Sequence, residues 1–256
     1  MLMGVAACAS KPPASDPEAL AIYRETNDPL EPMNRAILKF NQGMETVILK
    51  PVAKGYKAIL PAPARRSVYN ALHNLKSPVI LINDVLQGEG ERAGQTFLRF
   101  LINSTIGIGG LIDVADKVGL PSHDEDFGQT LAVHGGKEGA YLVLPLFGPS
   151  SLRDGFGLGV DVLLDPLFWI LRAEGVGYLN LARLGLEGID RLARNLDQLE
   201  DLQQSSLDYY AALRSAYRQN RSSEIANGRE EELDLPDYLF DEEFEDEDWD
   251  NGGESE

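Results

Sequence analysis

Apolar residues recur every three or four positions along much of the chain, which is the period of one face of an α-helix. Met33, Ile37, Phe40 and Met44 show this spacing near the start, and we expect Pro51 to break the pattern that they begin. Strict alternation of apolar and polar residues, which marks a half-buried strand, is scarce. The sequence therefore predicts a mostly α-helical protein.

The same spacing places four further helices along the chain. Residues 64–86 form one, in which Pro78 should end or kink the helix because it has no amide hydrogen. Residues 93–102 form another, which the following glycines stop, and 206–226 form the last. The remaining helix lies before residue 206 and carries the longest stripe of apolar residues: Leu181, Leu184, Ile189, Leu192, Leu196, Leu199 and Leu202. Residues 61–63, with two prolines, are typical of a loop.

Two stretches are unusually rich in apolar residues. Residues 141–149 are broken by Pro145 and Gly148, and residues 160–173 include Trp169. The second stretch suits a helix buried in the core, which its residues alone favour, or a helix at a membrane interface with Trp169 as an anchor. No run reaches the ~18 apolar residues that a spanning helix needs, so we expect no simple transmembrane helix.

Charge divides the 256-residue chain into three parts. Residues 229–256 hold 15 acidic residues and one arginine, a net charge of −14 out of −18 for the whole chain. Such a block is typical of a disordered acidic tail and disfavours nucleic acid, whose binding depends on Lys and Arg. We expect a signal remnant and linker over 1–27, a helical domain over 28–228, and the tail over 229–256.

Candidate catalytic chemistry is sparse. The three histidines and one cysteine do not have the spacing of a zinc site, and there is no nucleophile elbow, P-loop or metalloprotease motif. His123, in PSHDEDFG, is expected in a solvated loop, His134 in a turn, and His73 packed in a helix. We predict no enzymatic activity, cofactor or metal.

Cys8 follows Val5, Ala6 and Ala7 and precedes a polar, proline-rich linker that offers nothing to bury a thiol. An aliphatic residue, two small residues and a cysteine resemble a bacterial lipobox, so Cys8 is the candidate lipid anchor. Only seven residues precede it, none of them basic, whereas a signal peptide needs a basic start and an apolar stretch. We therefore expect the coding sequence of the leader to begin further upstream.

Distinctive segments follow one another over about 200 residues, from Asp28 to Gly228. They are NDPLEPMNRAILKFN (27–41), PVAKGYKAILPAPAR (51–65), NLKSPVILINDVLQG (74–88), RFLINSTIGIGGLIDVA (99–115), FGQTLAVHG (127–135), YLVLPLFGPSSLRDGFG (141–157), LEGIDRLARNLD (186–197), QSSLDYY (204–210) and AYRQNRSSEIANG (216–228). In this collinear order they resemble the MlaA/VacJ family of outer-membrane lipoproteins from Gram-negative bacteria.

The resemblance implies a ring of short amphipathic and interfacial helices around an amphipathic channel. The implied protein is anchored in the periplasmic leaflet of the outer membrane and associates with a trimeric porin. It takes mislocalised phospholipids from the outer leaflet to a soluble periplasmic carrier, without covalent chemistry. On this resemblance, an interfacial, lipid-facing helix is favoured for residues 160–173.

Three residues are assigned roles through the resemblance. Phe40 and Asn41 match a segment linked to channel gating, and we expect them to hold the resting state of the channel. The alternatives are helix packing for Phe40 and a cap or turn for Asn41. Arg183 is expected to meet the lipid phosphate, which a guanidinium can bind through two donors; the alternative is a surface arginine.

Other motif positions and functions remain open. Asp28, Pro29 and Asn34 are expected to set a helix start rather than to contact lipid. The tail carries Phe240, Phe244 and Trp249 among its acids, so it is either solvated or docks on the carrier. Two other functions compete with transport: a structural lipoprotein bound to a porin without its own channel, and an envelope hydrolase that uses His123.

Overall fold

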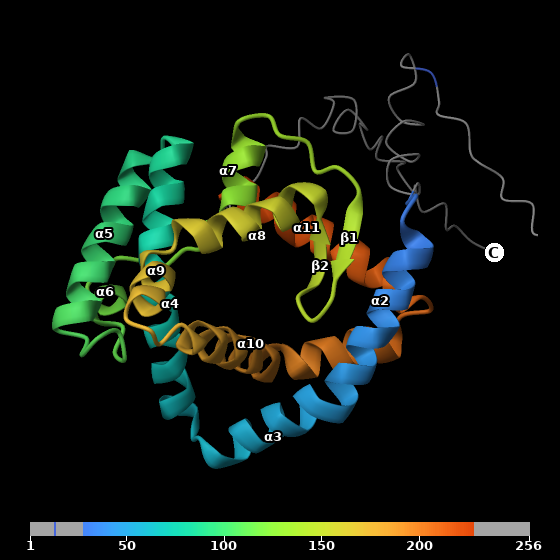
Figure 1. Ribbon diagram of the computed structural model, residues 1–256, viewed down its shortest axis with the longest axis horizontal. Helices are drawn as coiled ribbons and strands as arrows, with labels where there is room; N and C mark the ends of the chain where they lie inside the picture. Colours follow the sequence, from blue (N-terminus) through green and yellow to red (C-terminus); the bar gives the residue numbers. More distant parts are fainter. Residues whose placement is uncertain (1–12, 14–27, 228–256) are drawn as a thin grey trace, which may run out of the picture.

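The computed structural model describes residue 13 and residues 28–227, and it is mostly α-helical, as the sequence predicts (Figure 1). The predictions for 229–256, and for 1–27 apart from residue 13, lie outside the described residues. The elements are α2 (Glu31–Met44), a π-helical turn (Glu45–Leu49), α3 (Lys50–Ile59), α4 (Ala62–Gln87), α5 (Gly90–Thr105), α6 (Val114–Lys117), α7 (Phe127–Val133), β1 (Tyr141–Leu144), β2 (Gly148–Ser151), α8 (Leu152–Leu164), α9 (Pro166–Ala173), α10 (Tyr178–Ser205) and α11 (Tyr209–Ile225).

The helices are arranged as a closed frame. In Figure 1, α4 forms one side and α3 the base, α2 forms the opposite side, and α8 with α11 closes the top. The long helix α10 crosses this frame and packs against both α3 and α4. This arrangement agrees with the expected ring of helices.

The expectation that Pro51 interrupts the first helix is wrong. The chain stays helical from Glu31 to Ile59, through the π-helical turn. There the amide of Lys50 donates to the carbonyl of Glu45, five residues back, and Pro51 stands in the first turn of α3. The wider π-helical turn lies directly before Pro51, so the helix continues past a residue that has no amide hydrogen to donate.

Pro78 does not end its helix either, because α4 runs through it as one element. An interior proline costs about 3 kcal/mol through its missing hydrogen bond and its ring. Val79, Ile80 and Asn83 are buried directly after it, where α4 packs against α5 and α7. Burial of these three side chains outweighs the cost of a proline inside the helix. The predicted loop shrinks to Leu60 and Pro61, since α4 already begins at Ala62.

The glycines after α5 stop it as expected. Helix α5 ends at Thr105, and the loop that follows folds back on it. Gly110 has a φ of 91° and packs so closely on α4 that an added Cβ would overlap the side chain of Asn74. His134, the C-cap of α7, is followed by Gly135 with a φ of 83°, so it lies at a turn as predicted.

Residues 141–151 contain a two-stranded hairpin that the sequence reasoning missed. Tyr141 pairs with Ser151 and Leu144 with Gly148 in an antiparallel register. Tyr141 and Val143 are buried in an apolar cluster with Leu38 of α2 and with Tyr210 and Leu213 of α11. Four-residue strands next to prolines give too short a pattern to recognise, and the hairpin is held by helices distant in sequence.

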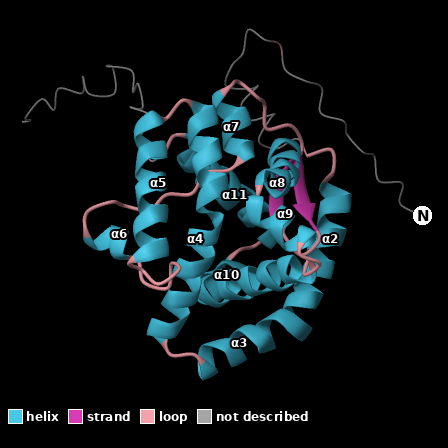
Figure 2. Cartoon of the chain, turned by 60° about the vertical axis from the view of Figure 1, so that its left-hand side comes forward, coloured by secondary structure: helices cyan, strands magenta, loops and turns pink. Residues whose placement is uncertain are grey.

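After the hairpin, the described chain continues as α8, α9, α10 and α11 (Figure 2). The single apolar stretch 160–173 becomes the end of α8, a corner at Asp165, and α9. The expected leucine stripe lies on α10, and the last expected helix is α11. Among the described residues, none of the helices combines enough length and apolarity to cross a bilayer.

Candidate functional site

The end of α8, the whole of α9 and the start of α10 present an apolar surface, which we call the apolar face. Among the described residues, α9 contributes none to the buried set, although it is almost wholly apolar. Trp169 is 50% exposed, and its indole nitrogen donates to the carbonyl of Leu163 at 2.8 Å. The other exposed members are Val162, Leu163, Ile170, Tyr178, Leu179, Leu181, Leu184 and Leu186.

Many exposed apolar residues on three consecutive helices are uncommon on water-soluble proteins and indicate a contact with lipid or protein. The bond of Trp169 is informative, because an indole that anchors at the headgroup level usually offers its N–H to the wet side. Here the donor is already satisfied within the protein, so the ring can enter an apolar environment. The expectation that 160–173 contains a lipid-facing helix is consistent with this exposure, whereas a core helix is not.

The corner between α8 and α9 is held by Arg183. Its guanidinium donates to the buried carboxylate of Asp165, whose other oxygen accepts from the amide of Leu167 at 2.9 Å and caps α9. Asn180, on the same side of α10, donates to the carbonyl of Phe168 at 3.2 Å. Arg183 is thus fixed in an ion pair, with its side chain 25% exposed. Its predicted contact with phosphate stays a prediction.

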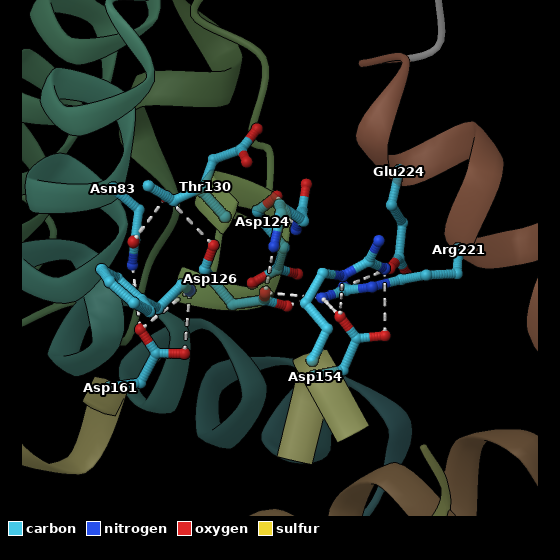
Figure 3. Close-up of polar contacts among 12 residues, drawn as sticks. Asn83, Asp124, Asp126, Thr130, Asp154, Asp161, Arg221 and Glu224 are labelled. Atoms are coloured by element: carbon cyan, nitrogen blue, oxygen red, sulfur yellow. Dashed lines mark hydrogen bonds and ion pairs between the residues drawn. The ribbon is translucent and has the colours of Figure 1, made fainter. Parts of the chain in front are cut away.

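A cluster of charged side chains lies at the other end of α8, around the buried Arg221 (Figure 3). Arg221 of α11 donates to Asp126 at 2.7 and 2.8 Å, to Asp154 at 2.9 Å and to Glu224 at 2.9 Å. Tyr217 also donates to Asp154. We call this set the charged network; it joins the first turns of α7 and α8 to α11.

The charged network holds Asp126 and Asp154 ionised. Burial alone would raise the pKa of Asp154, but hydrogen bonds from Arg153, Arg221 and Tyr217 outweigh it and keep that pKa well below its usual range. Burial likewise opposes the ionisation of Asp126, and Arg221 lowers its pKa. Each carboxylate therefore contributes stability as an anion.

The prediction for His123, which precedes Asp126 in the loop before α7, is wrong. This side chain is not in a solvated loop: its Nε2 lies 3.0 Å from the buried Asp84 and 3.1 Å from Thr96 Oγ1. The next residues reach other elements, with Asp124 accepting from Lys76 at 3.0 Å and Glu125 from Arg92 at 2.5 Å. The acidic run is a junction between α4, α5, α7 and α11.

Asp84, His123 and Glu125 place three ligand atoms within 4.8 Å of one another, close enough to surround a metal ion. The guanidinium of Arg92 is already bound to Glu125, and Gln87 donates to the same carboxylate at 2.8 Å. An arginine in that place supplies the positive charge that a metal would bring. This cluster therefore fits a structural role, as does the packed His73, where burial lowers the pKa.

The motif around α2 clamps the hairpin. Asn34, fully buried, donates to the carbonyl of Tyr141 at 2.9 Å and to Tyr210 Oη at 3.2 Å, and it accepts from the amide of Val143 at 2.9 Å. Asn34 therefore docks the hairpin and does not set the helix start. Asp28 does, since it accepts from the amide of Leu30 at 3.1 Å.

Asn41 and Phe40 differ in their surroundings. The amide group of Asn41 donates to the carbonyl of Leu144 and accepts from the amide of Leu146, both at 2.9 Å. It is neither a helix cap nor a turn residue; it bridges the turn of the hairpin to α2. Phe40 is 53% exposed, so helix packing does not explain why this residue is phenylalanine.

Cys8, the candidate lipid anchor, lies outside the described residues.

The site residues do not converge on one pocket. The buried polar and charged residues of the described chain, 16 in number, exceed the 12 buried apolar ones, while large apolar side chains lie on the surface. Sequence reasoning missed the roles of Arg221 and Asp154, which lie inside segments of the resemblance, and of Asp126, which lies in PSHDEDFG. Buried polar groups that are paired within the protein, together with exposed apolar residues gathered on α8, α9 and α10, are compatible with contact to lipid.

Comparisons with known proteins show which family the chain belongs to. A family model described as MlaA lipoprotein matches residues 26–224, and the chain belongs to this family. A Haemophilus influenzae protein named "Intermembrane phospholipid transport system lipoprotein MlaA" is 35% identical over 222 residues, covering 84% of this chain and 87% of its own. The Escherichia coli protein of the same name is 37% identical over 208 residues, covering 80% of each chain.

One solved structure is similar over nearly its whole length. It was described as a structural basis for the maintenance of bacterial outer membrane lipid asymmetry. It shares 34% sequence identity and a TM-score of 0.69 with this chain, and the alignment covers 78% of this chain and 99% of that one.

Proposed function

We propose that this protein removes mislocalised phospholipids from the outer leaflet of the outer membrane through an amphipathic channel and passes them to a soluble periplasmic carrier. It would act as a lipoprotein anchored through Cys8 at the periplasmic face, beside a trimeric porin. The names of its relatives, which refer to intermembrane phospholipid transport, support the substrate class. The proposal involves no covalent chemistry.

The observation that supports this proposal is that apolar side chains are exposed at one end of α8 and charged side chains are buried at the other. Helix α9 exposes its apolar residues while charges are buried at the opposite end of α8. Burying an unpaired charge in hydrocarbon is costly, so a lipid headgroup needs polar partners along its route. A helical frame that is apolar outside and polar within supplies a surface for the acyl chains and partners for the headgroup.

Lipid analysis of a deletion strain tests the transport function. Loss of the gene should cause phospholipid to accumulate at the cell surface, and the intact gene with its leader should reverse this. A structural lipoprotein bound to a porin would leave surface phospholipid unchanged. That result would contradict the transport proposal and favour the structural alternative.

Arg183 is proposed to contact the lipid phosphate while Asp165 holds it in place. A guanidinium has five N–H donors, and the pair with Asp165 leaves some of them available. Arg183→Gln should slow lipid transfer between vesicles by about tenfold, the loss of one charged hydrogen bond. Asp165→Asn is the matched control, because asparagine keeps the cap on α9. Equal slowing by both variants would indicate that Arg183 only holds the corner.

Asn41 and Phe40 are proposed to set the resting state of the channel through the hairpin. Asn41→Ala would free the turn at Leu144 and Leu146, which the asparagine now bridges. We expect faster hydrogen exchange of the Leu146 amide together with a changed rate of lipid transfer. Phe40→Ala should change the transfer rate without faster exchange. Unchanged transfer in both variants would contradict the gating role.

A further inference from the structure

The loop between α5 and α6, Ile106–Ile112, carries a second exposed apolar surface, which we call the apolar loop. It lies across the molecule from the β-hairpin (Figure 1). Ile106 is 68% exposed and Ile108 65% exposed, and Leu111 and Ile112 are exposed as well. The sequence has no charged residue between Arg99 and Asp113.

The backbone at Ile108 is unfavourable for its side chain. Its φ is 54°, a left-handed conformation that is uncommon for any residue with a Cβ and an outlier for a β-branched one. Glycine or asparagine would adopt it with less strain. Strain at an exposed apolar residue indicates that the side chain serves a purpose other than folding.

The apolar loop is rigid. Six of its amides donate to backbone carbonyls: Ile106 and Gly107 to Ile102, Gly109 to Ser104, Gly110 to Asn103, Leu111 to Ile108, and Ile112 to Gly107. A Cβ on Gly107 would overlap the carbonyl oxygens of Ile112 and Asn103, so glycine is required for this compact turn.

Side chains beneath the apolar loop hold it in place. Asn103 accepts from the amides of Val114 and Ala115 at 2.9 and 3.0 Å. Asn103 also donates to Asp113 at 2.9 Å, and Arg99 donates to the same carboxylate at 2.8 Å. The charges nearest to the loop are thus paired with each other below it.

We propose that the apolar loop inserts into the hydrocarbon of a phospholipid bilayer, as a contact separate from the apolar face. This inference rests on the proposed function and adds a second lipid-contact point. A bilayer requires that backbone groups be satisfied within the protein, whereas a protein partner can supply hydrogen bonds of its own. Six of the seven amides of the apolar loop donate within the protein, and this bonding and the charge-free sequence match the first environment.

Site-specific fluorescence tests the insertion. A probe is attached at Ile108→Cys in full-length protein with Cys8→Ser, reconstituted in vesicles of phosphatidylethanolamine and phosphatidylglycerol. We expect a blue shift and quenching by lipids brominated on their acyl chains. Ile170→Cys on α9 is the positive control, and Glu91→Cys, exposed at the other end of α5, is the negative control.

The outcomes separate the two proposals. A response at Ile170 without one at Ile108 would overturn insertion of the loop and leave the lipid-contacting apolar face intact. No response at either position would count against both. A shift at Ile108 that needs added porin would assign the loop to a protein partner and overturn the proposal.

Ile108→Gly distinguishes lipid contact from a structural role. The change relaxes the backbone and removes the apolar side chain, so the melting temperature in detergent should rise while binding of the Cys8→Ser protein to vesicles falls. The double variant Ile106→Asn, Ile108→Asn should weaken that binding by about tenfold or more. Full binding by Ile108→Gly would contradict the inference.

Discussion

Helix α8 begins among buried charges and ends in an exposed apolar surface. At its start, Asp154 accepts from Arg221 and Tyr217 and its pKa is held low. Near its end, Val162 and Leu163 are exposed, and α9 continues that surface. The two ends therefore differ in what their residues do: ion pairs and hydrogen bonds join helices at the start of α8, whereas apolar side chains at its end stay exposed.

The largest change is expected at the charged network. Arg221→Met would leave Asp154, whose side chain is 9% exposed, and the partly buried Asp126 without their common partner, and breaking a buried ion pair costs about 3–5 kcal/mol. Urea unfolding in mild detergent measures this loss. Arg35→Met is the control, since its pair with Asp208 is exposed and should contribute less than about 1 kcal/mol. Equal losses would mean that the charged network is no more important than a surface pair.

A somewhat smaller loss is expected at the hairpin. Asn34→Ala would leave the amide of Val143 and the carbonyl of Tyr141 buried without these partners. The unfolding free energy should fall by about 2–3 kcal/mol. Asn195→Ala, on an exposed part of α10, should change it by less than about 0.5 kcal/mol. A tolerated Asn34→Ala would show that the apolar cluster alone holds the hairpin.

Acid should weaken the charged end of α8 selectively. The pKa of Asp154 is depressed in the folded protein, so its contribution is complete above its unfolded pKa near 3.8 and is lost as the pH falls below that value. Asp154→Asn should therefore be less stable at neutral pH and flatten the acid side of the stability profile. An unchanged slope below pH 4 would contradict the role of this carboxylate.

The smallest effect on stability is expected at the apolar face. Ile170→Asn replaces an exposed side chain, so the unfolding free energy in detergent should change by less than about 0.5 kcal/mol. Vesicle binding of the protein lacking its lipid anchor should nevertheless fall by about tenfold. A large loss of stability with unchanged binding would reverse the assignment of this surface.

Helical periodicity predicted most helices because it depends on local spacing. Leu181 to Leu202 fall on α10, and the stop after α5 follows from its glycines. The expectation that Pro51 breaks the first helix was wrong, and Pro78 does not end α4, because the π-helical turn before Pro51 and the packing of α4 override the local preference of proline. The hairpin escaped prediction because its strands depend on Asn34, more than 100 residues earlier in the sequence.

The sequence by itself determined the helical class, the family resemblance and the candidate residues, since these depend on residue type and order. Only the tertiary structure decided what those residues touch. It placed His123 against Asp84, Arg183 against Asp165, and the acidic run 124–126 against three different helices. The identity of an apolar residue does not say whether it faces the core or lipid. The identity of an acidic residue does not say whether it is solvated or paired. Burial and partners are set by the approach of distant segments, which no local pattern records.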